Sequence, residues 1–299
     1  MFAGKLARAE IFGGGLRLSQ GAMGELKTDK ELAFIQDLFI AADWGERFAT
    51  LIDEHVKLPN EGSILYAGSG TGGHALALGQ TVSHKVALVC VEENEEAVEL
   101  AKAKAASVKT AVEFHNGKLH ALEFNDEQFD LVIADLSLVT PERMPSIVSE
   151  LARVAKSDAT VAFMLATASS FGEFFSIYWE ALHNSEIAEH EGDVEHLITA
   201  LPSVSEIENV ALRDGLRNIQ SWTQIEEFDY ESGEDFLNSP LVADFLLKGW
   251  LKSIPQNWQA RVQKEISGLI NEERHSAEFS LTVKATLVVG QKTPVPLVG

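Results

Sequence analysis

Gly68-Ser69-Gly70-Thr71-Gly72-Gly73 is a glycine-rich segment between a short apolar run and a helix-like stretch. Glycine lets a backbone turn sharply and approach a ligand closely, and the first turn of a following helix offers free N–H groups. The segment matches the G-x-G-x-x-G pattern of dinucleotide-binding loops, although a single match of this kind is weak evidence. Taken alone, these residues fit a loop that holds dinucleotide phosphates, a sulfonium cofactor or no ligand.

A carboxylate follows at the distance that ribose recognition requires. The apolar run Val86–Val91 ends at Glu92, about twenty residues beyond the last glycine of the loop. In a doubly wound sheet this position lies at the tip of the neighbouring strand, where a carboxylate accepts hydrogen bonds from ribose hydroxyls. The alternative for Glu92 is a solvated residue that opens the next helix, as the acidic residues Glu93, Glu95 and Glu96 suit a helix N-terminus.

The elements that position these residues alternate between strand-like and helix-like segments. Helices are expected over Glu95–Ala106 and Arg143–Lys156. Strands are expected at Ile64–Ala67, Val86–Val91, Ala111–Phe114, Phe129–Ala134 and Thr160–Leu165. This alternation predicts an α/β fold with a doubly wound, mostly parallel sheet.

Helical segments flank this core. A capping-box pattern at Thr28 and Glu31 begins one helix, Asp43-Trp44-Gly45 is expected to break it, and Glu46–His55 forms another. Residues 168–215 and 233–273 look helical, and each precedes or follows a further strand, at Leu216–Tyr230 and Phe279–Gly290. We expect three parts: an N-terminal arm and helical lid (1–60), a cofactor-binding core (61–167) and a helical cap with the last two strands (168–299).

Several motifs occur in a specific order: "LYAGSGTGG", then Glu92, "NGKLHAL", "FDLVIADLSL" and "MPSIVSELARVAKSDATVAFMLAT". Over roughly residues 64–165 the sequence therefore resembles the class I S-adenosylmethionine-dependent methyltransferases. The resemblance implies a Rossmann-like seven-stranded sheet, with six parallel strands and one antiparallel strand near the C-terminus. It also implies S-adenosyl-L-methionine as cofactor, bound by Tyr66, Ala67, Gly68, Ser69, Gly70, Gly72, Glu92, Glu93, Gly117, Lys118, Leu119 and Asp135.

Two positions depart from the family pattern. Tyr66 stands two places before the first glycine, where the family usually has an acidic residue. Its hydroxyl can donate or accept a hydrogen bond, but it supplies no negative charge beside a cationic cofactor. Lys118 stands where the adenine loop often has an acidic residue, and its backbone N–H remains available to adenine.

The candidates for catalysis are Asp135, His190 and Tyr178. In-line methyl transfer mainly requires alignment, and a base is needed only when the nucleophile must lose a proton. Asp135 ends the fourth strand, where it either lines the transfer pocket or caps the strand. His190 lies among acidic residues, at spacings from His183 and His196 that do not give the one-face pairing of a metal-binding helix, so no metal site is expected.

Tyr178 belongs to an aromatic run after the fifth strand. Insertions near the sixth strand sit over the edge of the sheet where ligands bind. We therefore expect this run to border an apolar pocket for a small, partly hydrophobic acceptor, although aromatic stripes at helical spacing are more often core. The members of the run are Phe171, Phe174, Phe175, Tyr178 and Trp179.

The bulk composition limits the partners. The formal net charge is −21, which repels phosphate backbones and anionic membranes, so neither nucleic acid nor membrane insertion is expected. The single cysteine, Cys90, excludes a disulfide within the chain and is expected to fill the core of a cytoplasmic protein. Oligomeric state is not indicated.

The leading hypothesis is a methyltransferase that uses S-adenosylmethionine to methylate a small, partly hydrophobic molecule by in-line transfer. Two alternatives remain open. One is a non-catalytic cofactor-binding or interaction protein of the same fold. The other is an NAD-dependent oxidoreductase, which the glycine pattern and Glu92 would also suit.

Overall fold

The computed structural model describes residues 27–273 and 278–294. Its strands are β1 (Gly62–Ala67), β2 (Val86–Glu92), β3 (Glu113–Asn116), β4 (Phe129–Asp135), β5 (Ala155–Ala166), β6 (Leu216–Tyr230) and β7 (Phe279–Lys292). Its helical segments are α1 (Asp29–Ile35), η1 (Gln36–Gly45), α2 (Glu46–His55), α3 (Gly73–Thr81), α4 (Glu95–Val108), η2 (Pro141–Arg143), α5 (Met144–Val154), α6 (Gly172–Asn184), η3 (Ala188–His190), α7 (Glu191–Ala200), α8 (Val204–Arg213), α9 (Gly233–Asn238), η4 (Leu241–Leu246), α10 (Leu247–Trp250) and α11 (Gln256–Glu273).

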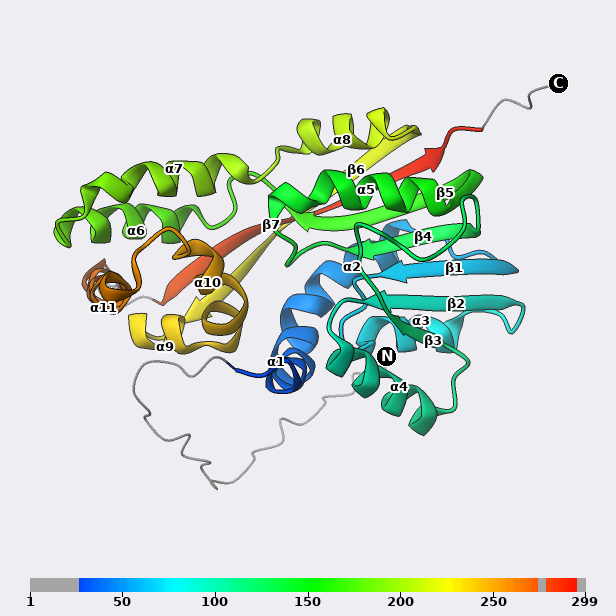
Figure 1. The fold of residues 1–299 in the computed structure, drawn as a ribbon, viewed down its shortest axis with the longest axis horizontal. Helices are drawn as coiled ribbons and strands as arrows, with labels where there is room; N and C mark the ends of the chain where they lie inside the picture. The colour runs from blue at the N-terminus through cyan, green and yellow to red at the C-terminus, as the bar shows by residue number, and fades with distance from the viewer. Residues whose placement is uncertain (1–26, 274–277, 295–299) are drawn as a thin grey trace, which may run out of the picture.

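All seven strands form one sheet in the order β3-β2-β1-β4-β5-β7-β6 (Figure 1). Strands β1 to β5 pair in parallel, and β7 runs antiparallel to both of its neighbours. The strand order reverses beside β1, which is the switch point where ligands bind in doubly wound folds. The expected Rossmann-like sheet, with its antiparallel seventh strand, is confirmed.

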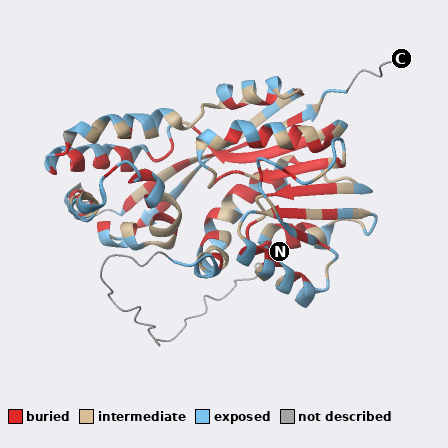
Figure 2. Ribbon diagram, in the orientation of Figure 1, coloured by how far each residue is buried: buried red, intermediate tan, exposed pale blue. Residues whose placement is uncertain are grey.

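Helices cover both faces of the sheet, which is why its central strands are almost continuously apolar. One face packs against α2, α3 and α4, and the other against α5 and α8. Successive residues of β1 alternate between the two cores: Ile64 and Tyr66 face the first, and Leu65 and Ala67 the second. Figure 2 shows these strands as the most deeply buried part of the molecule.

Several expected boundaries were wrong by a few residues. Strand β3 covers Glu113–Asn116 instead of Ala111–Phe114, and β5 begins at Ala155. The helix expected over Arg143–Lys156 ends at Val154, because Ala155 is already extended and its strand pairs with Phe129. Cys90 lies in the buried core, as expected for a small apolar side chain.

The expected break at Asp43-Trp44-Gly45 was also wrong. The chain stays helical from Asp29 to His55, because Gln36–Gly45 forms a π-helix that joins α1 to α2. Gly45 keeps an ordinary helical backbone, with φ −60°. Trp44 is buried, and its indole Nε1 donates to Ser137 Oγ at 2.9 Å. Burial of Trp44 against the end of β4 therefore overrides the local tendency of this segment to end the helix.

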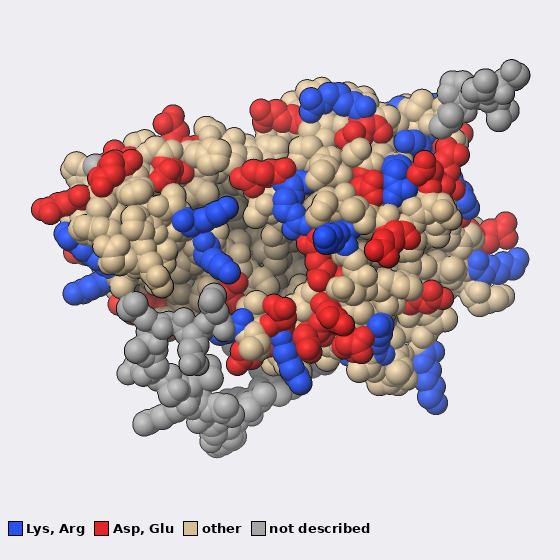
Figure 3. All heavy atoms as spheres, in the orientation of Figure 1, with Lys and Arg blue, Asp and Glu red and all other residues tan. Residues whose placement is uncertain are grey.

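The cap is built on the long antiparallel pair β6 and β7, which four helical segments join in the chain. Strands β6 and β7 continue beyond the end of β5, and the cap helices α6, α7, α9, α10 and α11 gather around that extension (Figure 1). Its core is aromatic: the rings of Phe174 and Trp250 stack with centroids 4.2 Å apart, and Phe236 meets Phe279 edge-on at 5.1 Å. Figure 3 shows the surface hollowed between this cap and the core of the sheet.

Candidate active site

A cavity of about 630 Å³ lies between the glycine loop and the N-terminal helices. The loop residues Gly68, Ser69 and Gly70 form one wall, together with Tyr66 of β1 and Asp135 at the end of β4. The opposite wall comes from η1 and α2, which contribute apolar side chains including Ile40, Trp44 and Ala49, and polar ones including Asp37, Glu46 and Asp53. The cavity is therefore partly apolar and carries several carboxylates.

The glycine loop has a backbone that only glycine adopts readily. Gly68 has φ +69°, and a Cβ there would lie 2.4 Å from the carbonyl oxygen of Asp135. The ends of β1 and β4 can approach this closely only because position 68 has no side chain. The backbone N–H of Gly68 donates to the carbonyl of Val91 at 2.8 Å, which fixes the loop to β2.

Glu92 ties the loop to the tip of β2. Its Oε2 accepts the N–H of Gly70 at 2.9 Å, and its Oε1 accepts the N–H groups of Glu93 and Asn94 at 2.8 and 3.1 Å. Burial raises the pKa of the Glu92 carboxyl, while these three N–H donors oppose that change. Oε1 uses both of its lone pairs on these donors, whereas Oε2 has a second lone pair that can accept a hydrogen bond from a ligand.

The segment expected to contact adenine is held beside Glu92. The Leu119 N–H donates to Glu93 Oε1 at 3.1 Å, and Gly117 N–H donates to the Glu92 carbonyl at 3.1 Å. Arg143 Nη2 lies 2.6 Å from Glu93 Oε1, and this cation helps to lower the pKa of the Glu93 carboxyl despite its partial burial. The Lys118 side chain is exposed.

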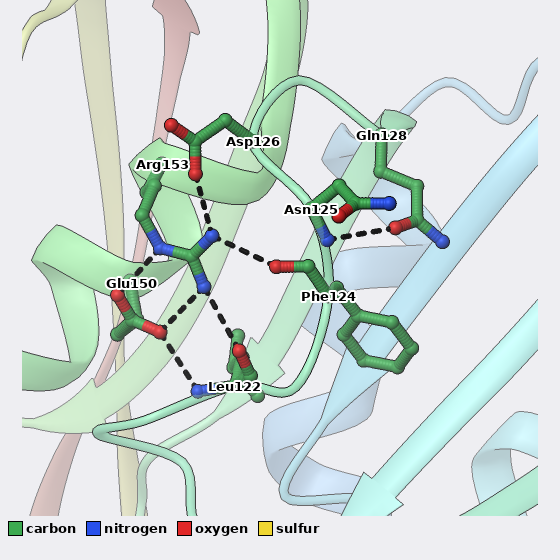
Figure 4. Close-up of polar contacts among 7 residues, drawn as sticks. All are labelled: Leu122, Phe124, Asn125, Asp126, Gln128, Glu150 and Arg153. Atoms are coloured by element: carbon green, nitrogen blue, oxygen red, sulfur yellow. Dashed lines mark hydrogen bonds and ion pairs between the residues drawn. The ribbon is translucent and has the colours of Figure 1, made fainter.

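The continuation of this loop is fastened to α5 by Arg153 (Figure 4). Its guanidinium donates to the carbonyls of Leu122 and Phe124, at 2.9 and 2.8 Å, and to Asp126 Oδ1 at 2.7 Å. Glu150 holds the other side of the guanidinium and also accepts the Leu122 N–H at 2.7 Å. A planar fork of five donors suits this position, because it can reach several acceptors at once.

Asp135 and Tyr66 face the cavity from neighbouring strands. Asp135 Oδ1 accepts the N–H of Ser137 at 2.9 Å, and burial raises the pKa of its carboxyl. Tyr66 is only 3% exposed, and burial also raises the pKa of its phenol, with a further contribution from Asp135. The Tyr66 hydroxyl lies 3.0 Å from His74 Nδ1.

Comparisons with known proteins identify a domain within this fold. Residues 64–158 match the family of methyltransferase domains. The matched segment, which covers β1 to β4 and the start of β5, is a methyltransferase domain. No curated protein gives a significant match.

Solved structures show the fold of the domain beyond the matched residues. The YcgJ protein from Bacillus subtilis superposes with a TM-score of 0.55 at 18% identity, over 84% of this chain and 100% of that one. A protein from Bacillus halodurans C-125, described as a methyltransferase candidate, gives 0.53 at 17% identity, over 83% and 100%. Phosphoethanolamine N-methyltransferase 2 from Haemonchus contortus, solved with S-adenosyl-L-methionine, gives 0.53 at 16% identity, over 89% and 57%.

The methyltransferase domain brings most of the sequence-predicted cofactor residues together. Tyr66, Gly68, Ser69, Gly70 and Asp135 line the cavity. The other seven lie outside its lining. Ala67 is buried in the sheet, Gly72 caps the N-terminus of α3, and Lys118 is exposed. Glu92 is hydrogen-bonded to Gly70 of the glycine loop, whereas Gly117 and Leu119 are hydrogen-bonded to Glu92 and Glu93.

The structure does not bring His190 or Tyr178 to this cavity. Tyr178 is buried in the cap, where its hydroxyl donates to the Trp250 carbonyl at 3.3 Å. His190 Nδ1 lies 2.8 Å from Asp193 Oδ2, at the junction of η3 and α7. The aromatic run around Tyr178 is not part of the cavity wall: four of its members are buried in the core, and Trp179 is 40% exposed. Within residues 27–273 and 278–294, no group of three or more His, Cys, Asp or Glu side chains could hold a metal ion.

Sequence reasoning missed the side chains that the N-terminal helices contribute to the cavity. Asp37 of η1 accepts from Thr71 Oγ1 at 2.6 Å and pairs with Lys104 Nζ at 2.5 Å, so it anchors η1 over the glycine loop. Asp53 of α2 contacts His74 in the first turn of α3. The available signal was the pair of helices expected between Thr28 and His55, which did not specify the faces that meet the loop.

Proposed function

We propose that this chain is a methyltransferase that uses S-adenosyl-L-methionine to methylate a small, partly apolar molecule. The observation that carries the proposal is a single continuous arrangement at the carboxyl edge of β1, β2 and β4. There the glycine loop, Glu92, the Gly117–Leu119 segment and Asp135 meet, and a cavity extends from the loop to Asp135. No described helix is long and apolar enough to cross a membrane. We place the activity in the cytoplasm because the lone, buried Cys90 favours a reducing compartment.

The residues present fit this cofactor by their chemistry. The positive φ angles of Gly68, Gly70 and Gly72 leave the loop without side chains at its sharpest points, so a ligand can approach the backbone. Glu92 would accept the ribose hydroxyls, and the segment around Leu119 would contact adenine. The amino-acid end and the sulfonium would face Tyr66 and Asp135. When bound, the cofactor supplies an already activated methyl group.

The chain's own contribution is alignment and exclusion of water. Trp44, Ile40 and Leu138 give the cavity an apolar side against which an acceptor can pack. Asp135 lies beside Gly68, and burial raises the pKa of its carboxyl, which favours the protonated form relative to an exposed aspartate. The acidic character of the whole chain and of this cavity disfavours a nucleic acid as acceptor.

Glu92 provides the test. Glu92→Gln should weaken S-adenosylhomocysteine binding about tenfold in calorimetric titration, because a charged hydrogen-bond acceptor is worth about 1.5–3 kcal/mol. Glu61→Gln, which alters an exposed carboxylate away from the cavity, is the matched control and should bind as the wild type does. Thermal unfolding of both variants separates a lost ribose contact from a collapsed loop. Equal affinity in wild type and Glu92→Gln would contradict the proposal.

A further inference from the structure

Three side chains from three elements form a hydrogen-bonded row at the cavity. The Tyr66 hydroxyl on β1 lies 3.0 Å from His74 Nδ1 on α3, and His74 Nε2 lies 3.1 Å from Asp53 Oδ1 on α2. All three residues line the cavity. Tyr66 occupies the position where the family pattern has an acidic residue, so this row begins where a negative charge is missing.

The row leads from the buried interior to solvent. Tyr66 is 3% exposed, whereas the side chains of His74 and Asp53 are 16% and 59% exposed. A carboxylate only accepts hydrogen bonds, so we assign the proton of His74 to Nε2, which donates to Asp53. In this tautomer Nδ1 accepts a hydrogen bond from the Tyr66 hydroxyl. In this arrangement each group donates toward Asp53, and the phenolic oxygen becomes richer in electrons toward the cavity.

We propose that Tyr66, His74 and Asp53 together replace the missing acidic residue and favour a cationic sulfonium ligand over its neutral thioether product. This inference rests on the proposed function, because it assigns these residues to the S-adenosylmethionine site. The charge of Asp53 acts through His74, and Tyr66 presents it to the ligand. His74 and Asp53 are therefore positioning residues that act through Tyr66.

Other charged groups around the cavity affect the same preference. Asp135 interacts with both Tyr66 and His74, and Glu46 of α2 is a further carboxylate in the cavity wall. Lys104 is the cation in that wall, and Asp37 pairs with it. Protonation of Asp135 on acidification would also weaken a sulfonium ligand. The test must therefore separate His74 from Asp135.

S-adenosylmethionine and S-adenosylhomocysteine form a matched pair of probes. Both carry the same nucleoside and the same amino-acid end, and only the first has a sulfonium charge. The ratio of their affinities therefore cancels contacts at Glu92 and any titration of the shared amino group.

The experiment is a calorimetric titration of the full chain with each probe at a single pH, so that the protonation of Asp135 stays the same throughout. The wild type should bind S-adenosylmethionine more tightly than S-adenosylhomocysteine. Asp53→Asn should lower this preference severalfold, because it removes the charge that the row carries to the cavity. His74→Leu and Tyr66→Phe should also lower the ratio of the two affinities, because each interrupts the row.

His84→Leu is the matched control, since His84 is exposed and outside the cavity wall, and it should retain the wild-type ratio of the two affinities. A wild type without a preference for S-adenosylmethionine would overturn the inference. So would an unchanged preference in Asp53→Asn and His74→Leu, which would assign the effect to Asp135. If neither probe binds, the proposed function itself fails, which is a different outcome from binding without a preference.

Discussion

At the residue scale, the site depends on a few positions where one residue type is required. Gly68 is the clearest, because its positive φ and the 2.4 Å approach to the Asp135 carbonyl both exclude a side chain. Glu92 is another, since its two oxygens accept three backbone N–H groups and hold the loop to β2. The sequence pattern predicted the places of both residues, because glycine and a strand-terminal acid are local signals.

Gly68→Ala should destabilise the protein and weaken S-adenosylhomocysteine binding. The added Cβ meets backbone, which cannot move aside cheaply, so a loss of about 2 kcal/mol or more in the free energy of unfolding is expected. Chemical denaturation and calorimetry measure the two effects. Gly268→Ala is the control: it lies in α11 with open space around its Cβ, and should be neutral or stabilising by up to about 1 kcal/mol. Equal stability of Gly68→Ala and wild type would show that β1 and β4 do not approach as described.

At the element scale, the sheet could be predicted because buried parallel strands are short apolar runs between helix signals. The bounds of β3 and α5 could not, since strand pairing and helix caps decide them. Burial of Trp44 keeps η1 helical through a segment that reads locally as a break. The aromatic run near Tyr178 would have the same helical spacing beside a ligand or in a protein core, so its environment could not be predicted. In the structure Phe174, Phe175 and Tyr178 are buried in the core.

Helix α5 also fixes the position of a loop, residues 122–126. Arg153 makes five hydrogen bonds: three hold residues 122–126 against α5, and two go to the Glu150 carboxylate within α5. Arg153→Lys should lower the free energy of unfolding by about 1–3 kcal/mol, because an ammonium cannot reproduce the planar fork.

The same variant should weaken S-adenosylhomocysteine binding severalfold, as the adjoining Gly117–Leu119 segment loosens. Calorimetry and denaturant unfolding provide the measurements. Arg213→Lys is the matched control, since the Arg213 Nε–H donates to a carbonyl of its own helix, and it should match the wild type in both. If Arg153→Lys bound S-adenosylhomocysteine as tightly as the wild type, the hydrogen bonds of Arg153 would not position the Gly117–Leu119 segment.

At the scale of the whole molecule, segments from both ends of the chain enclose the core. Helices within residues 29–55 form one wall of the cavity, and the antiparallel strands β6 and β7 support the cap. The row formed by Tyr66, His74 and Asp53 was beyond sequence reasoning for this reason. Its members lie on three elements, and only the packing of α2 against the sheet sets their distances.

The most direct test of the central claim is calorimetric titration of the wild-type chain with S-adenosylmethionine, S-adenosylhomocysteine and NAD. The account predicts saturable, one-to-one binding of both S-adenosyl ligands, with no detectable binding of NAD at the same concentrations. Binding of NAD alone would contradict it in favour of an oxidoreductase. Binding of none of the three would contradict it in favour of a protein that keeps the methyltransferase fold without its cofactor.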